Sequence, residues 1–412
     1  MPAQSTRTQT VPKPDALTIE IHRDIAAVCD LWRDLQRTTD AGPHDTWEWS
    51  NAWSQTVGNT IEPLIVIGRT TNGDALFLLP LAIRERRGCS VLEWFSPDQG
   101  NYASGLFHRT AWNHSDLPRG KTLLTHILAA LPRVDAVHLK NQPARNSGEC
   151  NPFSDLPVLA AASAGHAFPL SGEWAQHYNE RFSSRARSEL RRSERRLIEQ
   201  GELRCAIVAP GLNLEQAMNR MIQDKRRWFA EKGIHDCFAD PAICEFFKQL
   251  AIMPKGGDAP HLKLFELTVD GNPVAANLGL VHDNTFYGLV SSTTDGSLLR
   301  YSPGNVLFLR LVEQLAEEGI ERVDCGAGED TNKLRWCTVE RQRLHTIVPV
   351  TVKGRIYTAS LKTALAAKLH IKQSPRLWTA AKRLRQLTGA GTSQWSALGS
   401  RGIKSTAPRL QS

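Results

Sequence analysis

The amino-acid sequence predicts a protein of the α+β class in which a three-layer unit, a mixed and mainly antiparallel sheet flanked by helices, occurs twice in tandem. The chain of 412 residues is too long for one ordinary domain. The same order of strands and helices recurs in two successive stretches, and a basic segment without acidic residues follows them. The predicted parts are a disordered leader (1–16), a first unit (17–170), Arg-rich connecting helices (171–202), a second unit (203–358) and a basic helical tail (359–412) with a disordered end.

The first unit is predicted to begin with a strand at Leu17 and a helix capped by Asp24, whose apolar residues recur at three-to-four spacing. A short aromatic helix follows, and then three strand-like runs, the first two joined by Asn72-Gly73, a pair that favours a hairpin turn. A helix from about Ser115 to Leu131 leads to a last strand, which such a crossover makes parallel to its neighbour. The resulting order is β-α-α-β-β-β-α-β.

The second unit repeats this order after the Arg-rich helices. Its first helix is stopped by Gly233, and its second begins at Asp240-Pro241, a preferred pair for a cap and a first turn. Three strands joined at Asp270-Gly271 and Asp283-Asn284 form another meander, and a helix from Pro303 to Glu318 leads to the closing strand. The alternative is an ordinary α+β protein whose hairpins recur by coincidence.

Composition narrows the class of protein. No run of about 18 apolar residues is present to span a bilayer, and the polar start lacks the core of a signal peptide, so we expect a cytoplasmic protein. The 8 cysteines form no CxxC pair and no zinc-type spacing, which predicts reduced thiols and no metal. Of the 50 Lys and Arg residues, 14 follow Glu340, after which no acid occurs, so the preceding part holds 36 bases against 42 acids. The basic excess belongs to the tail, and it does not mark the body as a nucleic-acid binder.

The tail itself has two interpretations. Leucines alternate with lysines and arginines along two helical stretches that break near Pro375. This pattern fits a helix that docks on the acidic body, and it also fits an interfacial segment attracted to anionic lipid. We favour docking because Trp378 is the only aromatic residue in the helical stretches from Leu361 to Leu387 and the apolar faces are short. Peripheral membrane contact is the less favoured prediction, and the oligomeric state is not predicted.

The clearest local signal is the segment from Arg300 to Val306, between a strand and an amphipathic helix. Pro303 presets the first helical turn, and Gly304 leaves room for another group to approach the end of the helix. The first N–H groups of a helix attract phosphate, and Arg300 adds a positive charge nearby. The alternative is a plain capped helix without a ligand.

Several motifs together resemble a known family: LFLLPLAI, the loop from Asp98 to Tyr102, SELRRSERRLIEQG, DKRRW, VDGNPVAANLGL, RYSPGNVL and DCGAGEDTNKLRW. They resemble the GNAT-superfamily acetyltransferases grouped with the cellulose-biosynthesis protein CelD, which are similar to the FemABX transferases with their two GNAT units. The resemblance covers about residues 17–350.

This resemblance implies a coenzyme A site in the second unit. In GNAT enzymes an Arg/Gln-x-x-Gly-x-Gly/Ala loop binds the pyrophosphate, and here the spacing departs by one residue while Val306 replaces the last small residue. The implied co-substrate is acetyl-CoA or another acyl-CoA, with no metal. The residues implied to bind it are Val290, Ser291, Ser292, Arg300, Tyr301, Ser302, Gly304, Asn305 and Val306.

Acyl transfer to an amine needs a group that removes the amine's proton, because an amine of pKa near 10 is mostly charged at neutral pH. Glu329, in the Gly-rich segment after the last strand, is the first candidate for the base, and Asp324 is expected to order that segment. Tyr287, Tyr301 or water would protonate the departing thiolate, or the thiolate would leave unprotonated. Lys333 and Arg335 are expected to hold an anionic part of the acceptor.

The helix between Arg181 and Arg196 carries seven arginines and suggests an anion-binding surface. The functional interpretation places these arginines, Arg192 among them, in a groove between the two units, where they recognise a phosphorylated or polymeric acceptor. Further acceptor-binding candidates are Asp98, Tyr102, Lys225 and Trp228. The alternative is a solvated linking helix whose charges pair locally.

Three functions remain open on the sequence alone. The leading one is transfer of an acetyl or other acyl group from acyl-CoA to an amine or hydroxyl of a sugar, a polysaccharide precursor or an amino-compound. The second is FemABX-like transfer from aminoacyl-tRNA, the one case in which nucleic acid would be a partner. The third is a non-catalytic accessory role in polysaccharide biosynthesis.

Overall fold

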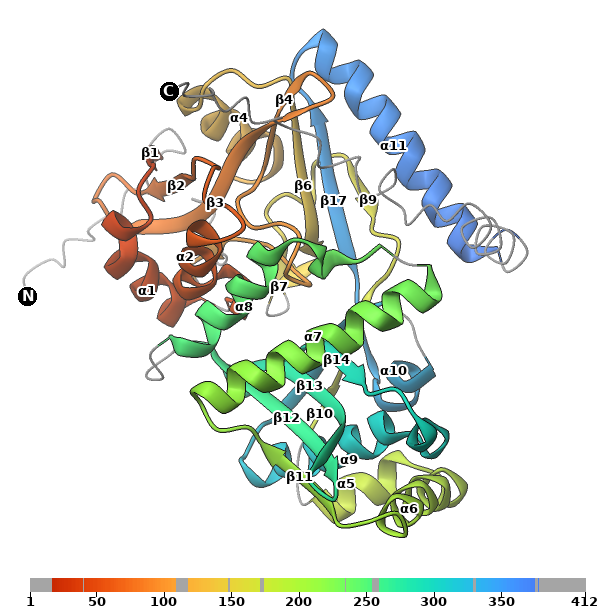
Figure 1. Ribbon diagram of the computed structural model, residues 1–412. Helices are drawn as coiled ribbons and strands as arrows, with labels where there is room; N and C mark the ends of the chain where they lie inside the picture. The colour runs from red at the N-terminus through yellow and green to blue at the C-terminus, as the bar shows by residue number, and fades with distance from the viewer. Residues whose placement is uncertain are drawn as a thin grey trace, which may run out of the picture.

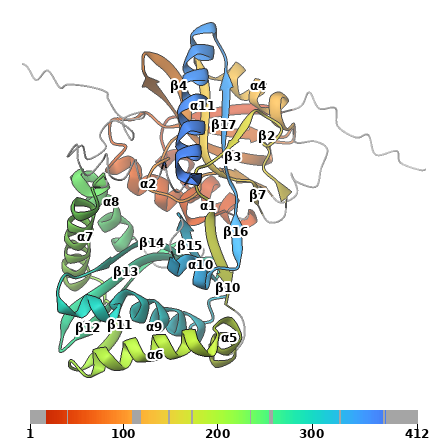
Figure 2. The same ribbon diagram turned by 90° about the vertical axis from the view of Figure 1, so that its right-hand side faces the viewer.

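The computed structural model describes residues 17–39, 41–108, 118–146, 149–170, 174–233, 235–253, 259–328, 331–374 and 377. These residues form two units, each built around one large sheet, that lie against each other (Figures 1 and 2). The prediction of a tandem α+β fold is confirmed.

The sheet of the first unit has eight strands, all antiparallel to their neighbours except for one central parallel pair. The strands are β1 (Thr18–His22), β2 (Leu64–Arg69), β3 (Ala75–Arg86), β4 (Cys89–Trp94), β5 (Leu106–Phe107), β6 (Ala136–Pro143), β9 (Val158–Ala160) and β17 (Arg343–Pro349). They lie in the order β1-β2-β3-β4-β6-β17-β9, with β5 beside β3. The parallel pair is β4 with β6, as the predicted crossover requires. A separate small hairpin pairs β7 (Arg145–Asn146) with β8 (Glu149–Cys150).

Helices cover both faces of this sheet because its central strands are apolar on both sides. On one face lie η1 (Ala26–Val28), α1 (Cys29–Thr38), η2 (Pro43–Asp45) and α2 (Trp47–Gln55); on the other lies α4 (Gly120–Ala130). In β2, Ile65 and Ile67 join the core under α1 and α2, while Leu64 and Val66 join the core under α4. This alternation follows from the two-residue period of a strand.

The second unit repeats the arrangement around a seven-stranded sheet. Its strands are β10 (Gly165–Pro169), β11 (Leu203–Ile207), β12 (His261–Val269), β13 (Asn272–His282), β14 (Thr285–Thr293), β15 (Arg322–Ala327) and β16 (Val339–Arg341), in the order β11-β12-β13-β14-β15-β10-β16. One face is covered by α7 (Leu212–Lys232), η3 (Cys237–Ala239) and α8 (Pro241–Ile252). The other is covered by α5 (Trp174–Arg181), α6 (Ser184–Ile198), η4 (Ser297–Tyr301), α9 (Pro303–Glu317) and α10 (Thr331–Trp336).

The two units are joined by a continuous hydrophobic core. Trp32 and Trp49 of the first unit belong to the same buried cluster as Met218 and Phe246 of the second. The ring of Trp49 meets that of Phe246 edge to face, with centroids 4.8 Å apart. Helix α2 therefore packs on α8, as Figure 1 shows, and the two units form one packed body.

Two strands cross between the units. β10 lies in the stretch predicted for the first unit, yet it pairs with β15 and β16 of the second sheet. β17 lies in the stretch predicted for the second unit, yet it pairs with β6 and β9 of the first sheet. Each sheet thus borrows a strand from the other part of the chain, an exchange that local sequence patterns do not encode.

The Arg-rich segment differs from the continuous helix expected between Arg181 and Arg196. It forms two helices, because the Ser183 side chain accepts a hydrogen bond from the Ala186 N–H and starts α6 as its N-cap. Arg181 ends α5 and donates to the backbone oxygen of Trp336 at 2.8 Å. Arg181 therefore holds α10 in place and does not belong to the arginine face of α6.

The chain after β17 forms α11 (Val352–Gln373), which lies along the edge of the first unit in Figure 1. Tyr357 and Leu361 are buried against Val91 and Ile347 of the sheet, so the start of the tail is docked. Apart from Ser374 and Leu377, the rest of the tail lies outside the described residues. Among the helices described, none is both long enough and apolar enough to cross a membrane.

Candidate functional site

The site begins where two neighbouring parallel strands of the second sheet part. β14 and β15 pair only from Thr285 to Tyr287. One residue further on, β14 bulges against β13: Gly279 faces Gly288, whereas Leu278 faces Val290, so Leu289 is an extra residue. A bulge bends the strand that contains it, and here it accompanies the separation of β14 from β15.

The separation opens a cleft of about 710 Å³, a volume in the usual range for small-molecule sites. Its walls come from α7, η3, β13, β14, α9, β15 and α10. Of the residues expected to bind a coenzyme, Val290, Ser291, Ser292, Gly304 and Asn305 line the cleft. So do Lys225, Trp228 and Lys333, which were expected to bind the acceptor. The cleft further contains Asp224, Phe229, Asn277, Phe308, Cys325 and Trp336, which the sequence did not single out.

The N-terminus of α9 lies at this cleft. Ser302, the N-cap, has left-handed backbone angles (φ 55°, ψ 55°), and Pro303 occupies the first helical turn. A Cβ at Gly304 would lie 3.2 Å from the Thr293 methyl group, which is tighter than an ordinary contact. Glycine therefore keeps the space between the helix end and β14 open, and the helix dipole favours an anion there.

Two polar side chains of the cleft wall lack partners. Ser292 is 9% exposed, and its hydroxyl has no hydrogen-bond partner among the described residues. The Oδ1 atom of Asn277 is likewise buried and unpaired within the described part of the chain. Buried polar atoms without partners are uncommon, and both atoms belong to residues that a ligand in the cleft would meet.

Positive charge gathers at the η4 turn that precedes α9. The guanidinium groups of Arg300 and Arg196 lie 4.8 and 5.9 Å from the ring centre of Tyr301. Helix α6 packs against this turn and against α9, because Leu190 and Leu197 are buried in the core on that side. Arg192 is exposed on α6, which lies at the far end of the second unit (Figure 1). The expectation that this helix borders a groove between the units is therefore wrong.

Not every residue of the predicted loop reaches the cleft. Val306 is fully buried in the core beneath α9, and Arg300, Tyr301 and Ser302 belong to η4 and the cap rather than to the cleft wall. Glu329, the first candidate for the base, lies outside the described residues. The assignments of roles to these residues remain predictions.

On the face of the second sheet that meets the first unit, a buried carboxylate lies beside the fork. Asp324 is 1% exposed and accepts hydrogen bonds from the Tyr102 hydroxyl (3.1 Å) and the Gly326 N–H (2.8 Å). Arg341 forms an ion pair with it at 3.3 Å. Burial raises the pKa of Asp324, while the charge of Arg341 and the two hydrogen bonds pull it back down. On balance the pKa of Asp324 stays above its ordinary value.

Two tyrosines flank this carboxylate. Tyr287 stands opposite Asp324 in the β14–β15 pairing, and Tyr102 comes from the first unit. Burial raises the pKa of both hydroxyls, so each stays protonated and can donate. Neither tyrosine nor Asp324 lines the cleft itself; Gly288 and Cys325, their neighbours in the chain, do. The sequence prediction grouped Tyr102 with Asp98, and only Tyr102 reaches the fork.

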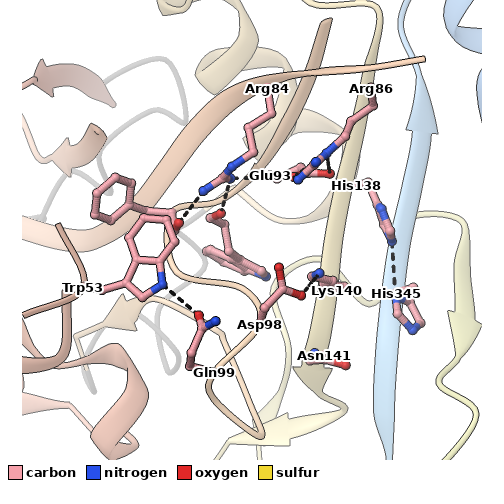
Figure 3. Close-up of polar contacts among 12 residues, drawn as sticks. Trp53, Arg84, Arg86, Glu93, Asp98, Gln99, His138, Lys140, Asn141 and His345 are labelled. Carbon is pink, nitrogen blue, oxygen red and sulfur yellow. Dashed lines mark hydrogen bonds and ion pairs between the residues drawn. The ribbon is translucent and has the colours of Figure 1, made fainter. Parts of the chain in front are cut away.

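Asp98 belongs instead to a polar cluster within the first unit, drawn in Figure 3. It pairs with Lys140 of β6, across the place where β4 and β6 part. Arg84 donates to the backbone oxygens of Trp94 and Phe95 just as the chain leaves β4. The positive charges of Lys140, Arg84 and Arg86 together hold the pKa of Asp98 below its usual range. Asp98 therefore supports the first unit and does not form a wall of the cleft.

The loop between Asp98 and Tyr102 also contains Asn101, which the sequence analysis did not identify. Its Oδ1 atom accepts from the Ala327 N–H at 3.0 Å, and its Nδ2 atom donates to the Gly288 oxygen at 3.4 Å. Gly288 belongs to β14 and Ala327 to β15, so one side chain of the first unit bridges both strands of the fork. No local signal in the sequence could have revealed this contact.

Within the described residues, no group of three or more His, Cys, Asp or Glu side chains could hold a metal ion. The cysteines described, including Cys325 and Cys337 near the cleft, are free thiols. The cleft thus presents backbone groups, a helix end, aromatic walls and lysines. This set suits an organic ligand with anionic groups at one end.

Comparisons with known proteins agree with this geometry. A family model described as an acetyltransferase (GNAT) domain matches residues 184–334, which include α7, the fork and α9. The fold is a tandem GNAT-like fold. The solved structure of FemX is 8% identical, with a TM-score of 0.52, over 80% of this chain and 97% of that chain. No curated protein sequence matches the chain.

Two further solved structures are more distantly similar. A tandem GNAT protein from the clavulanic acid biosynthesis pathway is 10% identical, with a TM-score of 0.45, over 80% of this chain and 97% of that chain. Saccharomyces cerevisiae N-myristoyltransferase with bound myristoyl-CoA is 10% identical, with a TM-score of 0.43, over 83% of this chain and 85% of that chain.

Proposed function

We propose that this protein is an acyltransferase that takes an acetyl or other acyl group from acyl-CoA and transfers it to an amine or hydroxyl of a small-molecule or saccharide acceptor. The observation that carries the proposal is the fork of β14 and β15, whose cleft contains the glycine-bearing N-terminus of α9. A parting pair of strands offers unpaired backbone groups to an extended pantetheine arm, and the helix end offers N–H groups to a pyrophosphate. Arg300 and Arg196 would attract the phosphate of the coenzyme that is not part of the pyrophosphate.

The proposed reaction has three parts: attack by the acceptor, stabilisation of the oxyanion and removal of the acceptor's proton. The acceptor nitrogen or oxygen attacks the thioester carbonyl, a backbone N–H of β14 near Val290 to Ser292 stabilises the oxyanion, and the coenzyme A thiolate leaves. The acceptor loses its proton to a carboxylate at the end of β15. Glu329 and Asp324 are the two candidates. Asp324 does not line the cleft, so it would act through a relay of water and the Tyr102 hydroxyl that bonds it.

Lys225, Trp228 and Lys333 are proposed to hold the acceptor or the acyl end of the donor. The Lys225 ammonium lies 4.5 Å from the Trp228 ring centre at the α7 side of the cleft. This aromatic and cationic wall suits a sugar, a polysaccharide precursor or an amino-compound as the acceptor. We further propose that the protein is one of the CelD-like acetyltransferases of polysaccharide biosynthesis. A cytoplasmic location is part of the proposal, since acyl-CoA is an intracellular metabolite.

An aminoacyl-tRNA donor is the second candidate, and the FemX fold likeness is the observation that favours it. Calorimetric titration separates the two. We expect coenzyme A to bind the wild-type protein and tRNA to show no binding that falls steeply with salt. Tight, strongly salt-dependent tRNA binding without coenzyme A binding would reverse the assignment.

Turnover identifies the acceptor and the base. Release of free coenzyme A thiol from a panel of acyl-CoA donors, screened with amino sugars and cell-extract metabolites, reports donor and acceptor classes together. Glu329→Gln and Asp324→Asn are then compared in the same assay. The true base is the residue whose replacement lowers turnover about 10²-fold or more with donor affinity retained. No turnover with any donor, despite coenzyme A binding, would favour an accessory role.

A further inference from the structure

The fork in the second sheet does not stand alone: a side chain of the first unit occupies its apex. Beyond the Tyr287–Asp324 pair, β14 and β15 no longer bond to each other. The carboxamide of Asn101 lies between them, accepting from Ala327 and donating to Gly288. It therefore replaces ladder hydrogen bonds that the parted strands have lost.

The orientation of this carboxamide is determined by its partners. A backbone N–H can only donate, so the atom facing Ala327 is the oxygen, and the amide nitrogen then faces the Gly288 carbonyl. Gly326 makes room for the contact. It has a φ of +72°, and a Cβ there would lie 2.5 Å from the Asn101 nitrogen.

The loop around Asn101 is held on every side. Arg343 of the exchanged strand β17 donates to the Asn101 backbone oxygen at 2.9 Å. Two contacts hold the loop just before Asn101. The Trp53 indole donates to the Gln99 side chain at 2.7 Å. Gly100 packs against the His44 ring so closely that a Cβ at Gly100 would lie 2.8 Å from it. After Asn101, Tyr102 bonds Asp324. A loop anchored in this way presents the carboxamide in a fixed position.

We propose that Asn101 is a positioning residue for acyl transfer: by bridging Gly288 and Ala327 it fixes how far β14 and β15 separate. This inference rests on the proposed function. The backbone N–H groups that would hold the pantetheine arm and the oxyanion follow Gly288 on β14, so their direction depends on where that strand is held. The first unit thus contributes to a site whose walls all belong to the second unit.

The test compares Asn101→Ala with a matched change in the same loop, Gln99→Ala. The hydrogen bond described for Gln99 is to Trp53, within the first unit. The Gln99 variant therefore weakens the anchoring of the loop but leaves the Asn101 bridge in place. We expect Asn101→Ala to weaken coenzyme A binding about threefold to tenfold and to lower kcat about tenfold or more, since misplacement by about 1 Å can cost 10²-fold. Gln99→Ala removes one anchor of the loop and keeps the bridge, so it should change both values clearly less than Asn101→Ala does, and the acceptor KM should change in neither.

Hydrogen exchange measures the fork directly and needs no substrate. The backbone amides of Val290 to Thr293 should exchange faster in Asn101→Ala than in the wild type, while those of β12 stay unchanged. Asn101→Asp, which keeps the acceptor for Ala327 but loses the donor to Gly288, should give an intermediate result and serves as the second variant if the alanine protein does not fold.

The outcomes separate this proposal from the proposed function. If the wild-type protein fails to bind coenzyme A, the proposed function is wrong, and exchange still reports whether Asn101 holds the fork. If the wild type binds coenzyme A, but the Asn101 variants bind it equally well and exchange like the wild type, the positioning role is wrong. The positioning role would also be wrong if the Asn101 variants lost thermal stability but showed no change in hydrogen exchange at β14, in kcat or in KM.

Discussion

The two units contain the same fork, and they use it differently. In the first unit β4 and β6 are parallel only at Val91 and Leu92 and then part, as β14 and β15 do after Tyr287. Charged side chains fill the first fork: Asp98 meets Lys140 across it, and Arg84 binds the carbonyls of the departing chain. The second fork opens as a cleft, with Asn101 only at its apex.

The helix that follows each fork differs in the same way. At the start of α4 the Gly120 N–H donates to the Pro152 oxygen at 2.8 Å, and a Cβ on Gly120 would lie 2.9 Å from the Asp155 side chain. The chain itself therefore occupies the helix end that a phosphate could use. At α9 the corresponding space beside Gly304 belongs to the cleft. The comparison teaches that a repeated fold retains its backbone fork while side chains decide whether it can bind a ligand.

The largest expected effect comes from closing the open helix end. Gly304→Val places methyl groups where even a Cβ is 3.2 Å from Thr293, and it blocks the approach of a phosphate. We expect coenzyme A affinity to fall about a hundredfold, or about 2.8 kcal/mol, with the fold retained. Calorimetry on the folded variant measures the loss. Unchanged binding would place the donor site elsewhere and remove the contrast between the units.

The next effect concerns the charge beside the open fork. Turnover that requires ionised Asp324 should fall as the pH drops through its raised pKa, giving an acid limb above the range of an ordinary carboxylate. Arg341 lowers that pKa, so Arg341→Gln should move the acid limb to higher pH. Rate profiles from pH 5 to 9 check both expectations. A limb that stays in place in Arg341→Gln would show that another group titrates.

A third substitution tests the filled fork. Arg84→Met leaves the Trp94 and Phe95 oxygens without their donor and removes one partner of the buried Glu93. We expect the free energy of unfolding to fall by about 2 to 4 kcal/mol, because a buried polar group that loses its partner still carries the full cost of its desolvation. Coenzyme A affinity should stay unchanged. Urea denaturation gives the stability. The control is Arg185→Met, whose side chain is 90% exposed and whose loss should cost little.

The smallest effect is expected at the rim of the same fork. Asp98 is 60% exposed, so Asp98→Asn should change stability by less than about 1 kcal/mol despite the Lys140 pair. The acceptor KM should also stay at its wild-type value, because Asp98 lies within the first unit. A marked rise in that KM, with donor affinity intact, would restore Asp98 as an acceptor-binding residue and would mean that the first fork contributes to the site.

The sequence by itself determined much of this protein. Turn pairs such as Asp270-Gly271, the cap Asp240-Pro241 and the stop at Gly233 acted locally, and each appears in the structure where the pattern required it. The repeated order of elements followed from hydrophobic periodicity, which also depends only on near neighbours. For the same reason, the segment from Arg300 to Val306 could be recognised as a possible anion site before its surroundings were known.

Only the tertiary structure decided which residues meet across the units. The exchange of β10 and β17, the Tyr102–Asp324 hydrogen bond and the Asn101 bridge join residues that lie about 150 to more than 200 positions apart in the chain. The tertiary structure also places Arg192 away from the interface between the two units, because the apolar face of α6 is buried against α9. Local patterns encode turns and periodicity, whereas contacts of this kind arise from packing two complete units, which no single stretch of sequence specifies.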